Sequence, residues 1–194
     1  MFSVNINKLV NASDKENESL TEITGNLLNE MGNGRTLAVI NGGVSAFKIA
    51  YHVAKTGKTV LFIDGDMSSN VFLGKYKLGK DMKGLVDYLK KPDNKYELIC
   101  LTNNDDMDII FTGGEADTEI TDDEKMILKS LLDKYLKEYD YIVLNSDEEG
   151  TMAMYCSGAV MLVDESQYDE TEVEQNVEKL ETLGCNVLGV VINE

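Results

Sequence analysis

The sequence predicts a three-layer, doubly wound α/β fold built around a mostly parallel sheet. Short apolar segments of the kind that form strands buried on both faces alternate with amphipathic helical segments along the chain. The 194 residues, 43% of them hydrophobic and 27% charged, suffice for one domain with a sizeable core. Because no internal repeat or low-complexity run interrupts the pattern, residues 1–194 are expected to form a single domain.

The first third of the chain supplies an arm, two helices and two strands. Residues 1–13 carry only a weak alternation and are expected to form a flexible arm. Asp14–Met31 is predicted to be helical because its apolar residues recur at helical spacing and glycines follow it. A strand at Leu37–Ile40, a helix ending at Thr56 and a second strand at Thr59–Ile63 come next.

The rest of the chain continues the alternation. Met82–Lys91 is predicted to be a short helix that the only proline of the chain closes. Two longer helices are expected to begin at capping boxes. These boxes are Thr121 with Glu124 and Asp169 with Glu172. The remaining predicted strands are Met107–Phe111, Tyr141–Leu144, Val160–Val163 and Val187–Ile192.

The charge balance narrows the classes of partner. With 35 acidic and 18 basic residues the net charge is −17, which disfavours nonspecific binding to nucleic acid or anionic lipid and repels free ATP. Such a chain favours a basic partner surface. No apolar run reaches the ~18 residues of a membrane span, and Met1–Val10 lacks the apolar core of a signal peptide. We therefore expect a cytoplasmic protein that does not insert into the membrane.

Cysteine and histidine provide no metal or catalytic pattern. Cys100, Cys156 and Cys185 are far apart and lie in or beside apolar segments, which predicts buried free thiols and no metal site. The single histidine, His52, has no acid or nucleophile pattern beside it and is expected to have a packing role.

The segment after the first strand has the spacing of a nucleotide-binding phosphate loop, whose pattern is G-x-x-x-x-G-K-[ST]. Gly42 and Lys48 keep the spacing, whereas Phe47 replaces the second glycine and Ile49 replaces the hydroxyl residue. The sequence thus predicts a P-loop whose cradle is filled by an aromatic ring and an aliphatic side chain. Gly42, Gly43 and Lys48 remain candidate nucleotide contacts, although the glycines also suit a tight turn.

Two carboxylates follow the second strand, in the sequence Asp64-Gly65-Asp66. Open α/β sheets bind their ligands at the carboxyl ends of parallel strands, so Asp64 and Asp66 are the candidate catalytic residues. The alternative is that both acidic residues only cap the strand end and the loop beside it.

Six segments in order resemble one family, the cytoplasmic kinase domain of bacterial tyrosine kinases from capsule and exopolysaccharide operons. Its relatives are the deviant-Walker P-loop ATPases that position chromosomes and division sites. The segments that carry the resemblance are Glu18–Leu28, Lys58–Met67, Gly84–Leu89, Asp108–Gly114, Tyr139–Leu144 and Leu183–Asn193. The resemblance implies a P-loop NTPase-like fold and places Asn193 on the adenine side of a nucleotide.

The chain departs from this family at the residues that handle nucleotide and assembly. Asn145 stands where the Walker B aspartate that orders Mg²⁺ is expected, and Ser68-Ser69 replaces an arginine. The assembly motif E-x-x-R-x-x-R keeps Glu22 but has Gly25 and Leu28 at its arginine positions. Together with the altered P-loop, these losses imply that the catalytic chemistry is gone while the scaffold remains.

The resemblance and its departures lead to three functional hypotheses. The first is a non-catalytic binding or regulatory module that docks a protein, either a membrane protein that regulates polysaccharide chain length or an active paralogue, and is recruited to the membrane by that partner. The second is a weak ATPase or protein-tyrosine kinase that uses Asp64 and Asp66, with Asp147 as a further ligand. The third is a positioning factor of the partitioning type. No cofactor is expected under the first; ATP and Mg²⁺ belong to the second. Homo-oligomers fit all three.

Overall fold

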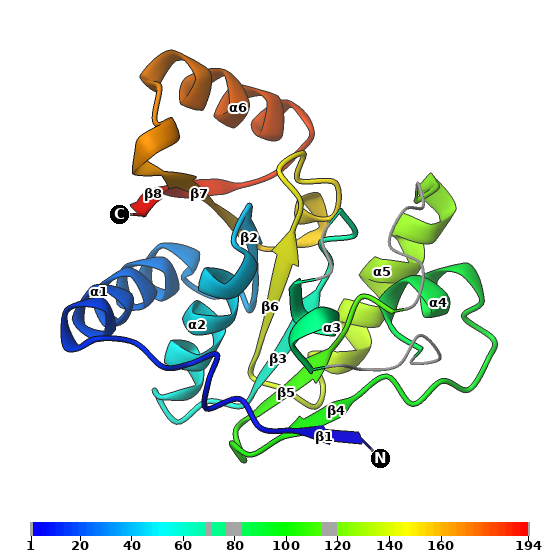
Figure 1. The fold of residues 1–194 in the computed structure, drawn as a ribbon. Coiled ribbons are helices and arrows are strands. Elements are labelled where there is room, and N and C mark those ends of the chain that lie inside the picture. Colours follow the sequence, from blue (N-terminus) through cyan, green and yellow to red (C-terminus); the bar gives the residue numbers. More distant parts are fainter. Residues whose placement is uncertain (1, 69–70, 77–82, 114–119, 194) are drawn as a thin grey trace.

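Eight strands form one sheet in the computed structural model, which describes residues 2–68, 71–76, 83–113 and 120–193 (Figure 1). The strand order is β1-β4-β5-β3-β6-β2-β7-β8, and every pair is parallel except β4 with β5. The strands are β1 (Phe2–Val4), β2 (Thr36–Ile40), β3 (Val60–Asp64), β4 (Cys100–Thr102), β5 (Met107–Ile110), β6 (Tyr141–Ser146), β7 (Gly158–Asp164) and β8 (Val187–Asn193). The predicted fold class is confirmed.

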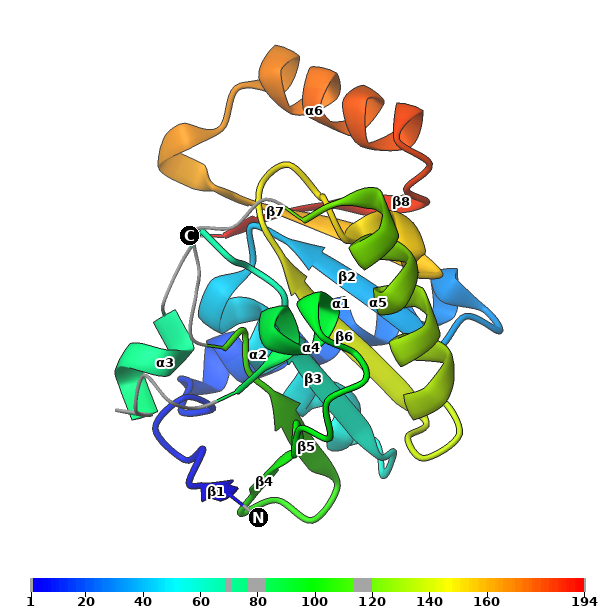
Figure 2. The same cartoon turned by 90° about the vertical axis from the view of Figure 1, so that its right-hand side faces the viewer.

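Helices cover both faces of the sheet. They are α1 (Asp14–Met31), α2 (Gly43–Ala54), α3 (Val71–Tyr76), α4 (Leu85–Lys90), α5 (Asp122–Tyr135) and α6 (Glu170–Thr182), with the 3₁₀ helices η1 (Ala153–Tyr155) and η2 (Glu165–Gln167). Figures 1 and 2 show α1 and α2 on one side of the central strands and α4 and α5 on the other. α6 lies over β7 and β8.

Alternation along the strands explains these layers. Leu37 and Val39 of β2 join the core under α1 and α2, whereas Ala38 and Ile40 of the same strand face α6. Successive side chains of a strand point to opposite faces, so a strand covered on both sides is apolar throughout. All five residues of β2 and of β3 are buried. β8, at the edge, is only half-buried over most of its length.

Residues 2–10 differ from the flexible arm that the sequence suggested. β1 pairs with β4, and Ile6 and Leu9 are 1% and 4% exposed within the core. The Ile6 amide donates a hydrogen bond to Asn103 Oδ1 at 2.7 Å. Because this segment has no clear periodicity, its sequence did not reveal that Ile6 and Leu9, with Val4 and Val10 packed against the same core, anchor it.

Three further expectations have an outcome in the described part of the chain. α4 begins at Leu85, and Met82, where the helix was expected to begin, lies outside the described residues. Cys100 and Cys185 are buried free thiols and Cys156 is half-buried. Among the described helices, none combines the length and apolar character that crossing a membrane requires.

Candidate functional site

The junction between β2 and α2 is too short to form a phosphate loop. β2 ends at Ile40 and α2 begins at Gly43, so only Asn41 and Gly42 separate strand from helix. A phosphate loop needs an extended run of backbone N–H groups before its lysine, but Lys48 here is the sixth residue of α2. The residues from Gly43 to Lys48, which the spacing suggested would form an extended loop, are therefore helical in this structure.

The two glycines serve this tight junction. A Cβ atom on Gly42 would lie 2.6 Å from Val39 Cγ1 and 2.7 Å from Ala46 Cβ, closer than side chains approach. Gly43 has a φ of 48° and Asn41 a φ of 55°, in the left-handed region that glycine and asparagine tolerate best. The glycines thus allow the chain to turn directly from strand into helix.

Phe47 and Ile49 also lie elsewhere than the sequence suggested. Both are buried in the core between α2 and the sheet, at 0% and 1% exposure. The Phe47 ring packs edge-on against Phe62 with centroids 4.9 Å apart, and tilted against Phe72 at 5.8 Å. The two side chains therefore do not fill a phosphate cradle; they hold α2 on the sheet.

Lys48 is engaged by another helix. Its ammonium forms an ion pair with the Glu16 carboxylate of α1. The Lys48 side chain is 16% exposed and that of Glu16 43%. This lysine therefore ties α1 to α2.

A buried hydrogen-bond network lies at the carboxyl ends of β3 and β6. The Asp64 carboxylate, 1% exposed, accepts from Thr112 Oγ1 at 2.7 Å and from Asn145 Nδ2 at 3.1 Å. Asn145 Oδ1 in turn accepts from the Gly43 amide at 3.0 Å. Burial raises the pKa of Asp64 to about 7, against the lowering effect of these hydrogen bonds. The network joins β3, β6 and the start of α2 into one closed unit.

Within the described residues, the carboxylates near this unit are engaged in hydrogen bonds. Asp64 is shielded from solvent, and Asp66 accepts from the Ser68 amide and hydroxyl at 3.0 and 2.6 Å, which closes the next turn. Asp147 accepts from the Thr151 amide at 3.1 Å. Within the described ranges, no three histidine, cysteine or carboxylate groups lie where they could hold a metal ion.

Asn193 is not near Asp64. It ends the edge strand β8 and is paired in register with Asp164 of β7. Strands β7, β2 and β6 stand between β8 and β3. Four strand spacings amount to about 19 Å. The sequence-predicted site residues are thus distributed along the sheet edge.

ATP with Mg²⁺, which the fold family implies, does not fit the residues present. A helix replaces the phosphate cradle, Lys48 is paired with Glu16, and an asparagine occupies the Mg²⁺-ordering position while bonding Asp64 and Gly43. No catalytic step through this cofactor follows from the geometry.

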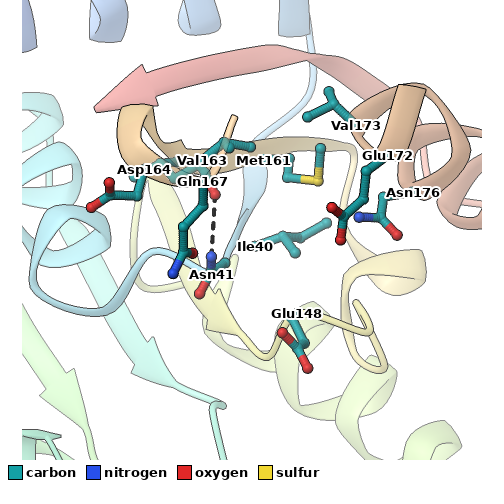
Figure 3. Close-up of a pocket in the computed structure, with 11 residues that line it drawn as sticks. Ile40, Asn41, Glu148, Met161, Val163, Asp164, Gln167, Glu172, Val173 and Asn176 are labelled. Atoms are coloured by element: carbon teal, nitrogen blue, oxygen red, sulfur yellow. Dashed lines mark hydrogen bonds between the residues drawn. The ribbon is translucent and has the colours of Figure 1, made fainter. Parts of the chain in front are cut away.

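A cavity of about 440 Å³ lies between α6 and β7, beside the carboxyl ends of β2 and β7 (Figure 3). It is lined by Ile40, Asn41, Glu148, Met161, Leu162, Val163, Asp164, Gln167, Glu172, Val173 and Asn176. Sequence analysis did not point to this cavity. Glu148 follows β6 and Asp164 ends β7, so both lie where parallel strands end, the position at which open α/β sheets bind ligands.

Known proteins identify the scaffold. A family model described as an AAA domain matches residues 34–183. Tyrosine-protein kinase CpsD of Streptococcus pneumoniae serotype 4 is 22% identical over 169 residues, which cover 84% of this chain and 71% of that kinase. The kinase domain of Escherichia coli tyrosine kinase ETK superposes with a TM-score of 0.78 at 18% identity, over 100% of this chain and 81% of that chain.

A more distant enzyme shares the same scaffold. Cobyrinic acid a,c-diamide synthase from Mycobacterium smegmatis, solved with an ATP analog and magnesium, has a TM-score of 0.63 at 16% identity, over 82% of this chain and 74% of that one. The likeness to these solved structures concerns the fold. The chain therefore belongs to the AAA-domain family, and its fold is that of the bacterial tyrosine-kinase domains that its motifs resemble.

Proposed function

We propose that this chain is a non-catalytic binding or regulatory module, related to the bacterial tyrosine kinases of exopolysaccharide synthesis, that docks a protein partner. The observation that carries the proposal is the two-residue junction between Ile40 and Gly43. A phosphate loop contributes several backbone N–H groups at once, and charge-assisted hydrogen bonds contribute about 1.5–3 kcal/mol each. Without the loop, its lysine and its Mg²⁺-ordering carboxylate, nucleotide affinity falls by about 10³-fold or more.

Calorimetric titration with Mg-ATP and with Mg-ADP tests the loss of nucleotide binding. We expect no saturable heat at millimolar nucleotide. Micromolar nucleotide binding that Lys48→Ala abolishes would contradict the proposal, because Lys48 would then contact the nucleotide and not only pair with Glu16. Lys137→Ala, at an exposed lysine outside α2, is the matched control.

The partner candidates are a membrane protein that regulates polysaccharide chain length and an active paralogous kinase. The names of the curated relatives support this class, since they are tyrosine-protein kinases. Co-elution of the purified chain with each purified candidate on size exclusion tests the two. A complex with either one supports docking, whereas this chain eluting alone with both would contradict this choice of partners.

An enzyme is the second candidate function, because Asp64 and Asp66 lie at the carboxyl end of β3, where open α/β sheets bind their ligands. Burial brings the pKa of Asp64 to about 7, where a carboxylate can exchange a proton near neutral pH. A weak ATPase or protein-tyrosine kinase would then use Asp64 with Asp66. Phosphate release at high protein concentration, with Asp64→Asn as the control, tests this candidate. We expect no release above the Asp64→Asn background.

A further inference from the structure

The cavity under α6 has an apolar floor. Ile40 of β2 and Met161 of β7 supply it from the sheet, and Val173 covers it from α6 (Figure 3). Protein interiors contain few voids larger than a water molecule, and this recess of about 440 Å³ is in the range of binding pockets. It is therefore a recess large enough for a ligand group.

α6 leaves this recess open because it packs loosely on the sheet. Of its thirteen residues only Leu180, near the carboxyl end, is buried. Val177 and Val173, about one and two turns earlier on the same helix face, are only half-buried. The first turn of α6 is capped by Asp169, whose Oδ1 accepts from the Glu172 amide at 3.0 Å. The helix thus covers the recess without filling the space below it.

The polar rim of the recess is acidic. Glu172 and Asn176 reach from α6 toward Ile40 and Met161, and Glu148 lies on the opposite side (Figure 3). Asp164 lies at one end and accepts from the Ser166 amide at 2.9 Å. Among the described residues, the lining contains no lysine, arginine or histidine. Two rim carboxylates, Glu148 and Glu172, with no cation among the described lining residues, disfavour phosphate and other anions in this recess and favour a cation.

A hydrogen-bonding group beside the floor is also unused. Ser146 is the register partner of Ile40 in the neighbouring strand, so both side chains point to the same face. Its residue is 1% exposed, and its hydroxyl has no hydrogen-bond partner within the described part of the chain. Buried hydroxyls are normally satisfied. Three amides of the lining, Asn41, Gln167 and Asn176, provide further acceptor oxygens.

We propose that this recess receives an arginine side chain carried by a basic segment of the protein partner. The aliphatic stem of arginine suits the floor of Ile40 and Met161, and its guanidinium can donate to the Glu148 and Glu172 carboxylates. A planar group with five donors suits mixed carboxylate and amide acceptors better than an ammonium does. The net charge of −17 would draw such a segment to the protein. This inference rests on the proposed docking function and names its chemistry.

The test uses N-acetyl-arginine amide as the probe and its neutral isostere N-acetyl-citrulline amide as the comparison. Both are titrated into the ¹⁵N-labelled full chain at physiological salt, where long-range attraction is screened. We expect saturable amide shifts at Met161, Val163 and Val173 with the arginine probe, and an affinity about tenfold or more above that of the citrulline probe.

Two double variants distinguish binding in the recess from attraction by the overall negative charge. Glu148→Gln with Glu172→Gln should weaken arginine binding about tenfold. Glu174→Gln with Glu178→Gln removes the same charge from exposed positions of α6 outside the lining, and should change it less than about twofold. Unchanged amide spectra elsewhere verify the fold of each variant.

Several outcomes would overturn the inference. They are shifts that do not saturate or lie outside the lining, equal affinity for the two probes, and equal effects of the two double variants. These outcomes would leave the docking function standing if nucleotide titration remained blank. Conversely, Mg-ATP binding that depends on Lys48 would remove the proposed function whatever the arginine probe does.

Discussion

Two sites along the carboxyl ends of the strands differ in how completely they are filled. At the closed edge, formed by Asp64, Thr112 and Asn145 with Gly43, each of these polar side chains makes a hydrogen bond, and Phe47 fills the core behind. At the α6 cavity, the helix buries one residue, and carboxylates face a recess of about 440 Å³. In this fold, therefore, the region that resembles a nucleotide site by sequence is filled, and the space for a ligand lies beyond β6, over β2 and β7.

The largest effect is expected from truncating Phe47 at the closed edge. Phe47→Ala removes a fully buried ring that contacts Phe62 and Phe72, and should lower the free energy of unfolding by about 3–5 kcal/mol. Urea unfolding measures it. Phe2→Ala, at a phenylalanine that is 54% exposed, is the matched control and should cost about 0.5 kcal/mol or less. Nearly equal destabilisation by the two variants would mean that the Phe47 ring is exposed in solution, which would contradict the contrast between the two sites.

A pH-dependent effect is expected at Asp64. Its pKa is 3.8 in an unfolded chain and about 7 when folded. The folded state therefore binds the proton more tightly, so the stability due to this group decreases as pH rises from about 4 to 7 and is lowest above 7. Asp64→Asn removes this dependence, and its stabilising gain should grow by about 2–3 kcal/mol between pH 5 and pH 8.

Asp64→Asn is compatible with the surrounding network. The Thr112 hydroxyl also donates to the Asp64 carbonyl at 3.1 Å, so it can accept from the new amide while keeping that bond. Asp93→Asn, at an exposed position, controls for the loss of one charge. Destabilisation by Asp64→Asn at pH 8 would mean that the charged carboxylate has a stabilising partner in solution. That result would favour the enzyme hypothesis.

The fold could be predicted from the sequence because its signals are local and repeated. Apolar strands such as Thr59–Ile63 and the capping box at Thr121 with Glu124 each predict their own element, and the element order predicts the sheet. β1 and β4 were not predicted, since three-residue strands are too short for a periodic pattern.

The site could be predicted only in part. The family resemblance implied that Asn145 stands in the place of a Mg²⁺-ordering aspartate, but its bonds to Asp64 and Gly43 depend on three separate elements. The spacing of Gly42 and Lys48 matched a P-loop by number alone, because a motif does not reveal where a strand ends and a helix begins. The cavity depends on how far α6 stands from β7, which no local pattern encodes.

A smaller effect is expected at the roof of the α6 cavity. Val173 is half-buried and borders empty space, so Val173→Ala should lower the free energy of unfolding by less than about 1 kcal/mol. Leu180→Ala, on the same helix at 2% exposure, is the matched control and should cost about 2–4 kcal/mol. Thermal unfolding of both variants gives the difference. Equal costs would indicate that the recess is closed in solution.

The smallest effect concerns the ion pair between α1 and α2. A double-mutant cycle with Lys48→Met and Glu16→Gln should give a coupling of about 0.2–1 kcal/mol, because Glu16 is 43% exposed and solvent screens the pair. High salt should reduce the coupling. Glu18→Gln, an exposed neighbour on α1, should show no coupling to Lys48→Met.

The single variant Glu16→Gln distinguishes two explanations for the loss of Mg-ATP binding. One is that Glu16 sequesters Lys48, and the other is that the phosphate loop is missing. If Lys48 were only sequestered by Glu16, freeing its ammonium would restore Mg-ATP binding. If the missing loop is decisive, the variant should bind no better than the parent chain in the same calorimetric titration. We expect no binding, since one freed ammonium cannot replace the N–H cradle that the helix from Gly43 onward removes. Mg-ATP binding by the Glu16→Gln variant would show that the ion pair between Lys48 and Glu16, and not the backbone of the junction, prevents nucleotide binding.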